Sequence, residues 1–179
     1  MHSDEELLRG FGGGDRGALG ALAGRYERPL LSLARAILGS DDLAADAVQE
    51  TWLRVIRYAG GFNGRSSVKT WIYRIAINQC RNLLSARPVE VGEAGGEMAA
   101  AGGESAAAGD DPVKAAMRQD EAERLKLAVE GLSPPLRETV LLCYTHGLTH
   151  DEAAEAMGIP VGTVKSRVHA ALEELRGRL

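Results

Sequence analysis

Five polar side chains near the C-terminus have the chemistry needed to contact a nucleic acid. They are Thr163, Lys165, Ser166, Arg167 and His169. Cations contact phosphates, and hydroxyls and cations also hydrogen-bond the edges of bases in the major groove. All five lie outside an apolar stripe with spacings of four, four and three residues: Val164, Val168, Leu172 and Leu175. This period predicts a helix that buries the stripe and exposes the polar group.

The residues just before this helix predict a second helix and a tight turn. Thr149 and Glu152 have the spacing of a capping box, in which each side chain bonds the backbone N–H of the other residue. Gly158 suits the left-handed residue that ends a helix, and Pro160 suits the next helix's first turn. An ordinary helical hairpin with a charged face has a similar pattern. The short turn and the small Ala153 and Ala154 favour a DNA-binding helix-turn-helix over residues 149–175.

A second group of residues combines cations with aromatic rings. Between residues 62 and 89 every formal charge is positive: Arg65, Lys69, Arg74, Arg81 and Arg87. Phe62, Trp71 and Tyr73 lie among them. Single-stranded nucleic acid requires this combination, because phosphates need charge and unstacked bases need a flat surface. The alternative is that Trp71 and Tyr73 pack in the core, and at least one of them is expected to do so.

A third group forms a polar face with one leucine on it. Asp46, Gln49, Glu50 and Leu53 share one side of a predicted helix. This face is either solvated surface or a docking surface for a basic partner. Composition alone favours solvated surface.

The elements that carry these groups are all helical. Helices are predicted over residues 3–10, 15–38, 40–58, 67–84, 112–130 and 133–145, followed by the segment 149–175. Ile56 and Tyr144 are expected to face inward on their helices. The glycines of the FGGGD segment form a hinge, because no Lys-Ser or Lys-Thr pair follows them to bind phosphate.

Residues 88–111 predict a flexible acidic linker. They are rich in Gly and Ala, and all their formal charges are negative. Such a segment buries too little apolar surface to fold alone. The predicted fold class is therefore all-α, with two small helical domains, 1–87 and 112–179, and a helix-turn-helix at the end of the second.

Composition limits the possible functions. The net charge of the 179 residues is −4, whereas a free-standing DNA-binding domain is usually basic. A partner is therefore expected to supply much of the affinity for DNA. No nucleophile–base pair is evident, so the protein is not expected to be an enzyme.

Cysteine use and targeting signals indicate the compartment. Cys80 and Cys143 are predicted to be separate thiols in a reducing environment. Cys143, His146 and His150 have a metal-like spacing, but they offer only three ligands and Gly147 interrupts them. We expect no metal and no cofactor. The chain begins without a signal-peptide pattern and has no apolar run of membrane-spanning length, so a cytoplasmic protein without membrane insertion is expected.

Three segments together resemble the bacterial RNA polymerase sigma factors, in the short form of the extracytoplasmic-function group. They are DAVQETWLRV from residue 46, FNGRSSVKTWIYRIAINQCRNLL from residue 62, and LSPPLRETVLLCYTHGLTHDEAAEAMGIPVGTVKSRVHAALEELR from residue 132. GTVKSR alone is weak, because response-regulator output domains carry similar helices. The ordered combination around a linker is specific.

The resemblance implies partners and residue roles. Core RNA polymerase would bind the helix 41–58 through Asp46, Gln49, Glu50 and Leu53. Promoter DNA would be opened near position −10 by Phe62, Asn63, Arg65, Ser66, Lys69, Trp71, Arg74 and Asn78, with Asn63, Arg65 and Ser66 holding a flipped base. The −35 element would be read by Thr163, Lys165, Ser166, Arg167 and His169. Many relatives are held inactive by an anti-sigma factor, although this sequence does not identify one.

The last predicted helix departs from the family pattern in its charge. Where the family often has arginine, this chain has Ala170, Ala171, Glu173 and Glu174, which weakens the expected phosphate contact.

Two other functions fit parts of the sequence. A stand-alone helix-turn-helix regulator would use residues 112–179 and would not need the basic-aromatic segment. A metal-dependent hydrolase would use Cys143, His146 and His150.

Overall fold

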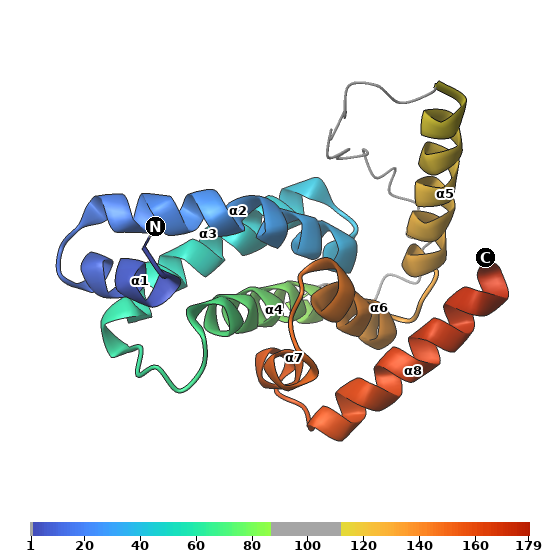
Figure 1. Ribbon diagram of the computed structural model, residues 1–179. Coiled ribbons are helices and arrows are strands. Elements are labelled where there is room, and N and C mark those ends of the chain that lie inside the picture. The colour runs from blue at the N-terminus through green and yellow to red at the C-terminus, as the bar shows by residue number, and fades with distance from the viewer. Residues whose placement is uncertain (1, 87–111) are drawn as a thin grey trace.

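The computed structural model describes residues 2–86 and 112–179, and the side chains from residue 119 onward in the second range. Both ranges are helical and neither contains a β-strand, which confirms the all-α prediction. The predicted linker 88–111 lies outside the described residues. Figure 1 shows α1 to α4 on one side of the molecule and α5 to α8 on the other.

Four helices and one short turn build the N-terminal domain. They are α1 (Asp4–Gly12), α2 (Arg16–Leu38), α3 (Asp41–Tyr58), the 3₁₀ turn η1 (Ala59–Gly61) and α4 (Val68–Ala86). Ser3, Asp15 and Ser40 cap the first three helices by accepting backbone N–H bonds. The ends predicted for these helices are therefore close to those observed, because local capping chemistry determines them.

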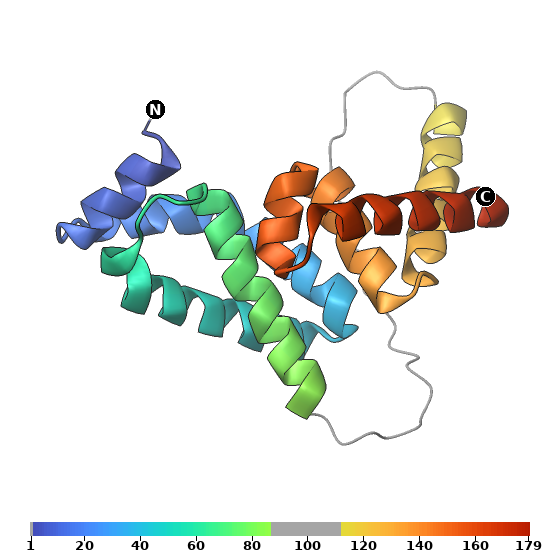
Figure 2. The ribbon, with the colours of Figure 1, turned by 90° about the horizontal axis from the view of Figure 1, so that it is seen from below.

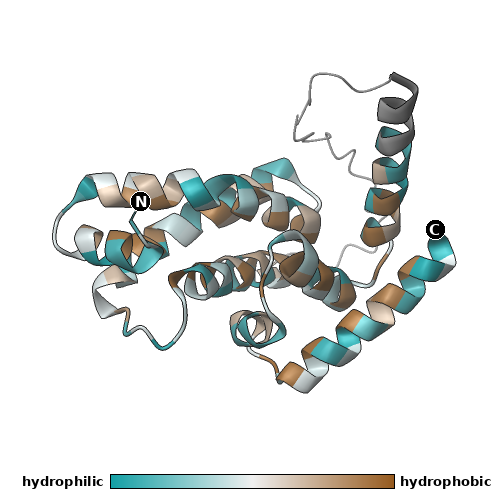
Figure 3. Cartoon of the chain, in the orientation of Figure 1, coloured by the Kyte–Doolittle hydropathy of each residue, from teal (hydrophilic) through white to brown (hydrophobic). Residues whose placement is uncertain are grey.

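The inward sides of these helices form the main core. Leu22, Leu30, Leu33, Ile72 and Ile77 are fully buried. Figure 3 shows the apolar stripes along the helices facing one another. The inward orientation predicted for Ile56 is wrong, because its side chain is 45% exposed. Val55 occupies the buried side at this turn, and the next residue is rotated by about 100° around the helix.

The C-terminal domain contains α5 (Pro112–Glu130), α6 (Pro134–Val140), α7 (His150–Met157) and α8 (Val161–Arg178). The Thr149–Glu152 capping box is present in both directions, with N–H···O distances of 3.2 and 2.8 Å. Gly158 has φ +68°, a left-handed conformation that favours glycine. Pro160 lies at the cap position just before α8 rather than inside its first turn. The predicted helix-turn-helix is thus formed by α7 and α8.

A π-helical turn, η2 (Leu141–Thr145), continues α6. The N–H of His146 bonds the carbonyl of Leu141, five residues earlier. This wider turn changes which side chains face the core. Leu142 is fully buried and Tyr144 is 61% exposed, so the prediction that Tyr144 faces inward is wrong.

The two domains pack directly on each other. The main hydrophobic cluster continues from α4 into the second domain through Leu142, Leu148, Ala153, Met157 and Val164. Both ribbon views place α7 against α4 (Figures 1 and 2). A smaller cluster joins α5, α6 and α8 through Ala128, Leu132, Val140, Ala171 and Leu175. The sequence did not predict this close contact between the domains.

Polar bonds accompany the apolar contact. The Arg81 guanidinium donates to the Met157 carbonyl and to the Glu138 carboxylate, each at 2.8 Å. Burial raises the pKa of Glu138, and the nearby Arg81 opposes that rise. Arg137 of α6 donates to the Ala36 carbonyl of α2 at 3.2 Å. These contacts fix the second domain across the ends of α2 and α4.

Among the described helices, none is both long and apolar enough to cross a lipid bilayer. Cys80 is buried, and burial raises its pKa to about 12. Cys143 is partly buried and also a free thiol with a raised pKa, for the same reason. Neither thiol is activated as a nucleophile, because thiolate formation is disfavoured at both positions.

Candidate nucleic-acid interface

The loop between η1 and α4 is a compact turn that presents polar side chains to solvent. The Asn63 Oδ1 accepts the Arg65 backbone N–H at 3.2 Å, and Gly64 between them has φ +68°. The Ser67 hydroxyl oxygen accepts the Thr70 N–H at 3.0 Å and so caps α4. Asn63 and Arg65 are exposed, and Ser66 is partly exposed. The loop is therefore held by hydrogen bonds between its side chains and its own backbone, while Asn63, Arg65 and Ser66 remain accessible.

One face of α4 continues this polar surface. Phe62 packs against Trp71 with ring centroids 5.3 Å apart and an interplanar angle of 54°. Trp71 is half-buried, whereas Arg74 and Asn78 are exposed on the same side of the helix. Tyr73 points into the core and is 2% exposed. Of the two candidate stacking rings on α4, only that of Trp71 is partly exposed to solvent.

Lys69 lies on a different side of α4 from Trp71 and Arg74. Its ammonium donates to the Gly147 carbonyl in the C-terminal domain at 3.1 Å. The structure packs Phe62 against Trp71 and keeps Arg74 and Asn78 on the same side of α4, whereas it directs Lys69 toward the second domain. Spacing on the helix could have revealed this, because residues 69 and 71 are about 200° apart.

Close to Lys69, His146 and Tyr73 form a polar contact between the domains. The Tyr73 hydroxyl and the His146 Nδ1 are 3.1 Å apart, and their rings are tilted at 52°. The Nε2 of His146 is buried without a hydrogen-bond partner. Burial, and secondarily the charge of Lys69, lowers the pKa of His146 to about 4. His146 is therefore neutral at physiological pH.

The start of α8 presents the C-terminal polar group. Lys165, Ser166 and His169 are exposed, while Thr163 and Arg167 are partly exposed. The Ser166 hydroxyl donates to the Thr163 carbonyl at 3.0 Å. Arg167 lies close enough to Glu138 to favour the ionised carboxylate. Val164, Val168 and Leu175 are buried as predicted, and Ala171 joins them while Leu172 is partly exposed.

The third predicted group lines a groove between α3 and α4. Asp46, Gln49, Glu50 and Leu53 border a cavity of about 320 Å³. The opposite wall is Gln79, Asn82 and Leu83 of α4, which the sequence analysis did not single out. Their spacing of three and one places them on one helical side, and this signal was available in the sequence.

The groove has an apolar centre and polar edges. Leu53 is 53% exposed and supplies an apolar side chain to the groove. Glu50 pairs with Arg54 at 3.0 Å, an exposed ion pair that a partner can replace at little cost. A second cavity of about 460 Å³ continues the groove, and Asn78 and Arg81 are among its lining residues.

No group of three or more metal-ligating side chains comes together in the described ranges. His146 is turned toward Tyr73, as described above, rather than toward Cys143 and His150. The arrangement thus offers cations, a flat ring and hydrogen-bonding groups for nucleic acid.

The fold and its exposed groups define a class of protein: an all-helical nucleic-acid-binding protein with a helix-turn-helix. Residues 22–87 match the family model "Sigma-70 region 2", and residues 122–175 match "Sigma-70, region 4". The "ECF RNA polymerase sigma-E factor" of Haemophilus influenzae is 30% identical over 99% of this chain and 95% of its own length. The "RNA polymerase sigma-H factor" of Pseudomonas aeruginosa is 31% identical over 98% of this chain and 93% of its own.

A solved structure has the same overall fold. CnrH, in complex with the cytosolic domain of CnrY, superposes with a TM-score of 0.70 over 98% of this chain and 96% of its own, at 23% identity. Taken with the sequence matches, the chain belongs to the ECF sigma factors of the sigma-70 family.

Proposed function

We propose that this protein binds core RNA polymerase through the α3–α4 groove and directs it to promoters. The observation that carries the proposal is that both surfaces share α4: Asn78, on the same side as the half-buried Trp71, also lines the cavity that continues the groove. A polymerase held in the groove would place DNA beside the unstacking surface. The net charge of −4 fits this arrangement, since the polymerase supplies most of the DNA affinity.

The N-terminal surface acts in strand opening. Melting costs a few kcal/mol for each unstacked step. Capture of a flipped base by Asn63, Arg65 and Ser66, with stacking on Trp71, returns about 1–3 kcal/mol per base. Arg74 and Asn78 contact the adjacent strand and the edge of the duplex. No covalent chemistry is required, so the protein acts as an initiation factor rather than an enzyme.

The helix α8 reads the −35 element of the promoter. Thr163, Lys165, Ser166 and Arg167 lie in its first two turns, where a recognition helix meets base edges and phosphates. His169 follows on the same exposed side. Arg176 and Arg178 pair with Glu173 and Glu174, so the second half of α8 offers little free positive charge.

The contact between the domains limits access to α4. Lys69 and Arg81 both donate to groups of the C-terminal domain. Separation of the two domains would free Lys69 to contact DNA. An anti-sigma factor that stabilises the packed arrangement, and a cytoplasmic location beside the polymerase, are parts of this proposal.

In vitro transcription with purified core polymerase on a library of promoters tests the proposal. We expect initiation at a defined subset of sequences only when this protein is added. Lack of initiation on every promoter, together with tight binding to duplex DNA without polymerase, would instead support a stand-alone regulator.

A further inference from the structure

A cavity beside the 59–64 segment is lined on one side by α1, a helix that lies before the residues matched by the family model. Its volume is about 500 Å³, in the range of small-ligand sites. Ala59, Gly60, Phe62, Asn63 and Gly64 line one side. Glu5, Leu8, Arg9 and Gly12 of α1 line the other, and α1 precedes the matched residues 22–87.

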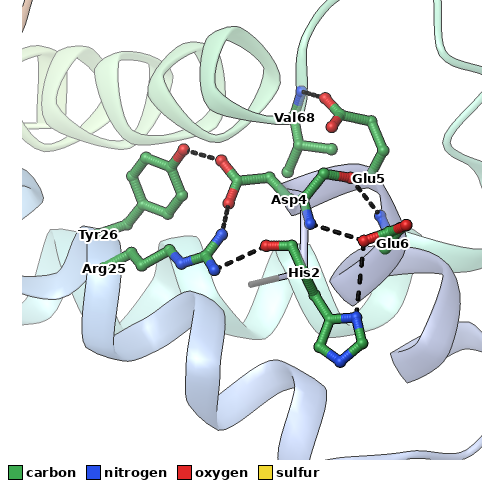
Figure 4. Close-up of polar contacts among 8 residues, drawn as sticks. His2, Asp4, Glu5, Glu6, Arg25, Tyr26 and Val68 are labelled. Carbon is green, nitrogen blue, oxygen red and sulfur yellow. Dashed lines mark hydrogen bonds and ion pairs between the residues drawn. The ribbon is translucent and has the colours of Figure 1, made fainter.

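Several contacts hold α1 in position as this wall. Asp4 bonds both Arg25 and the Tyr26 hydroxyl of α2, and Arg25 also donates to the His2 carbonyl at 2.8 Å (Figure 4). Leu7 and Leu8 are buried. The Glu5 Oε1 accepts the Val68 backbone N–H at 3.4 Å, which links α1 to the start of α4 (Figure 4). One oxygen of the Glu5 carboxylate therefore faces the start of α4.

The cavity presents an acceptor, a donor and a cation. Within the described residues, the second carboxylate oxygen of Glu5 has no hydrogen-bond partner, and a carboxylate is an acceptor only. The Asn63 carbonyl oxygen is occupied by the Arg65 N–H, which leaves the amide NH₂ as a donor. Arg9 lies one turn after Glu5, is exposed, and has no ion-pair partner in the same part of the chain.

We infer that α1 completes the pocket for an unstacked promoter base and selects one with an exocyclic amine. Glu5 accepts the amine, Phe62 covers one face of the ring, and Arg9 contacts a neighbouring phosphate. Adenine, cytosine and guanine carry such an amine, whereas thymine presents a carbonyl oxygen that the carboxylate repels. This inference rests on the proposed role in strand opening.

The test uses holoenzyme reconstituted from this full chain and core polymerase. Bubble templates are prepared in which each unpaired non-template base is replaced in turn by an analogue without its amine: purine for adenine, hypoxanthine for guanine and 2-pyrimidinone for cytosine. At one position we expect removal of the amine to weaken binding about 5-fold or more.

Glu5→Gln provides the decisive variant. The amide carbonyl can still accept the Val68 N–H, but the other end becomes a donor. At that position the response to amine removal should fall below about 2-fold, and thymine should become the better base. Glu27→Ala removes an exposed carboxylate of α2 outside the cavity and should behave as the unmodified protein.

Arg9→Ala should weaken binding about equally for every base, whereas the control Arg28→Ala on α2 should leave it unchanged. If Glu5→Gln responds to the analogues as the unmodified holoenzyme does, while that holoenzyme opens the promoter, the inference is wrong and the proposed function stands. If the unmodified protein with core polymerase neither binds the bubble templates nor initiates on any promoter, both are wrong.

Discussion

Trp71 is the side chain on which strand opening depends most in the proposed function. It offers a half-exposed ring supported by Phe62, and Arg74 lies one turn further along the same face. Replacing both Trp71 and Arg74 with Ala removes the stacking surface and one phosphate contact. We expect promoter opening, followed by 2-aminopurine fluorescence, to fall by about 5- to 100-fold.

Binding to core polymerase, measured by fluorescence anisotropy, should change little in this variant. Thermal unfolding checks that the loss of the Phe62 contact leaves the domain folded. Equal losses of opening and of core binding would contradict the role assigned to Trp71. Trp71→Phe should retain part of the opening activity, because it keeps a ring.

Lys165 and Arg167 should contribute through charge. Replacing both with Ala should weaken −35 binding and lower the slope of log K against log salt by roughly one for each lost phosphate contact. The measurement is a salt titration of holoenzyme on duplex −35 DNA. Arg176→Ala is the matched control, because Arg176 already pairs with Glu173. An unchanged slope in the double variant would mean that neither cation touches phosphate.

At the level of elements, α3 and α4 act together, since neither helix alone forms the proposed docking groove. Leu53→Asp places a charge at the apolar centre of the groove and should weaken core binding at least about 10-fold. Ile56→Asp is the matched control, because Ile56 is also exposed on α3 but does not line the groove. Similar losses in a core-binding titration of both variants would show that the groove is not the docking site.

For the whole molecule, the packed arrangement of the two domains should weaken in acid. The pKa of His146 is about 4 in the packed state and about 6.5 when the side chain is free in water. Protonation therefore favours separation. The stabilisation is fully present above pH 6.5 and is lost progressively as the pH falls toward 4, by up to about 3 kcal/mol.

Fluorescence energy transfer between labels on α2 and α8 measures this separation. The signal should fall between pH 6.5 and 4 in the unmodified protein. His146→Gln keeps a polar group beside Tyr73 but does not titrate, so its signal should fall less. Glu138 is the main confounding group: its raised pKa favours the packed state in acid, and it is present in both proteins. Identical pH profiles would exclude His146 as the cause.

Local sequence chemistry determined most of the elements and the types of the candidate functional residues. Ser3, Asp15 and Thr149 cap helices by bonds to residues two or three positions away, so they act in the same way in any tertiary setting. The polar side of α8 follows from the spacing of Val164, Val168 and Leu175. The basic-aromatic segment was also evident, because charge and ring content need no fold to be recognised.

Tertiary structure alone decided how distant segments meet. Residues far apart in the chain meet in the cavity between α1 and the 59–64 segment, in the groove between α3 and α4, and in the contact of Lys69 with Gly147. The exposed Tyr144 depends on a π turn that helical spacing did not reveal. Hydrophobic burial is non-directional, so an apolar stripe shows that a helix packs but does not identify its neighbour.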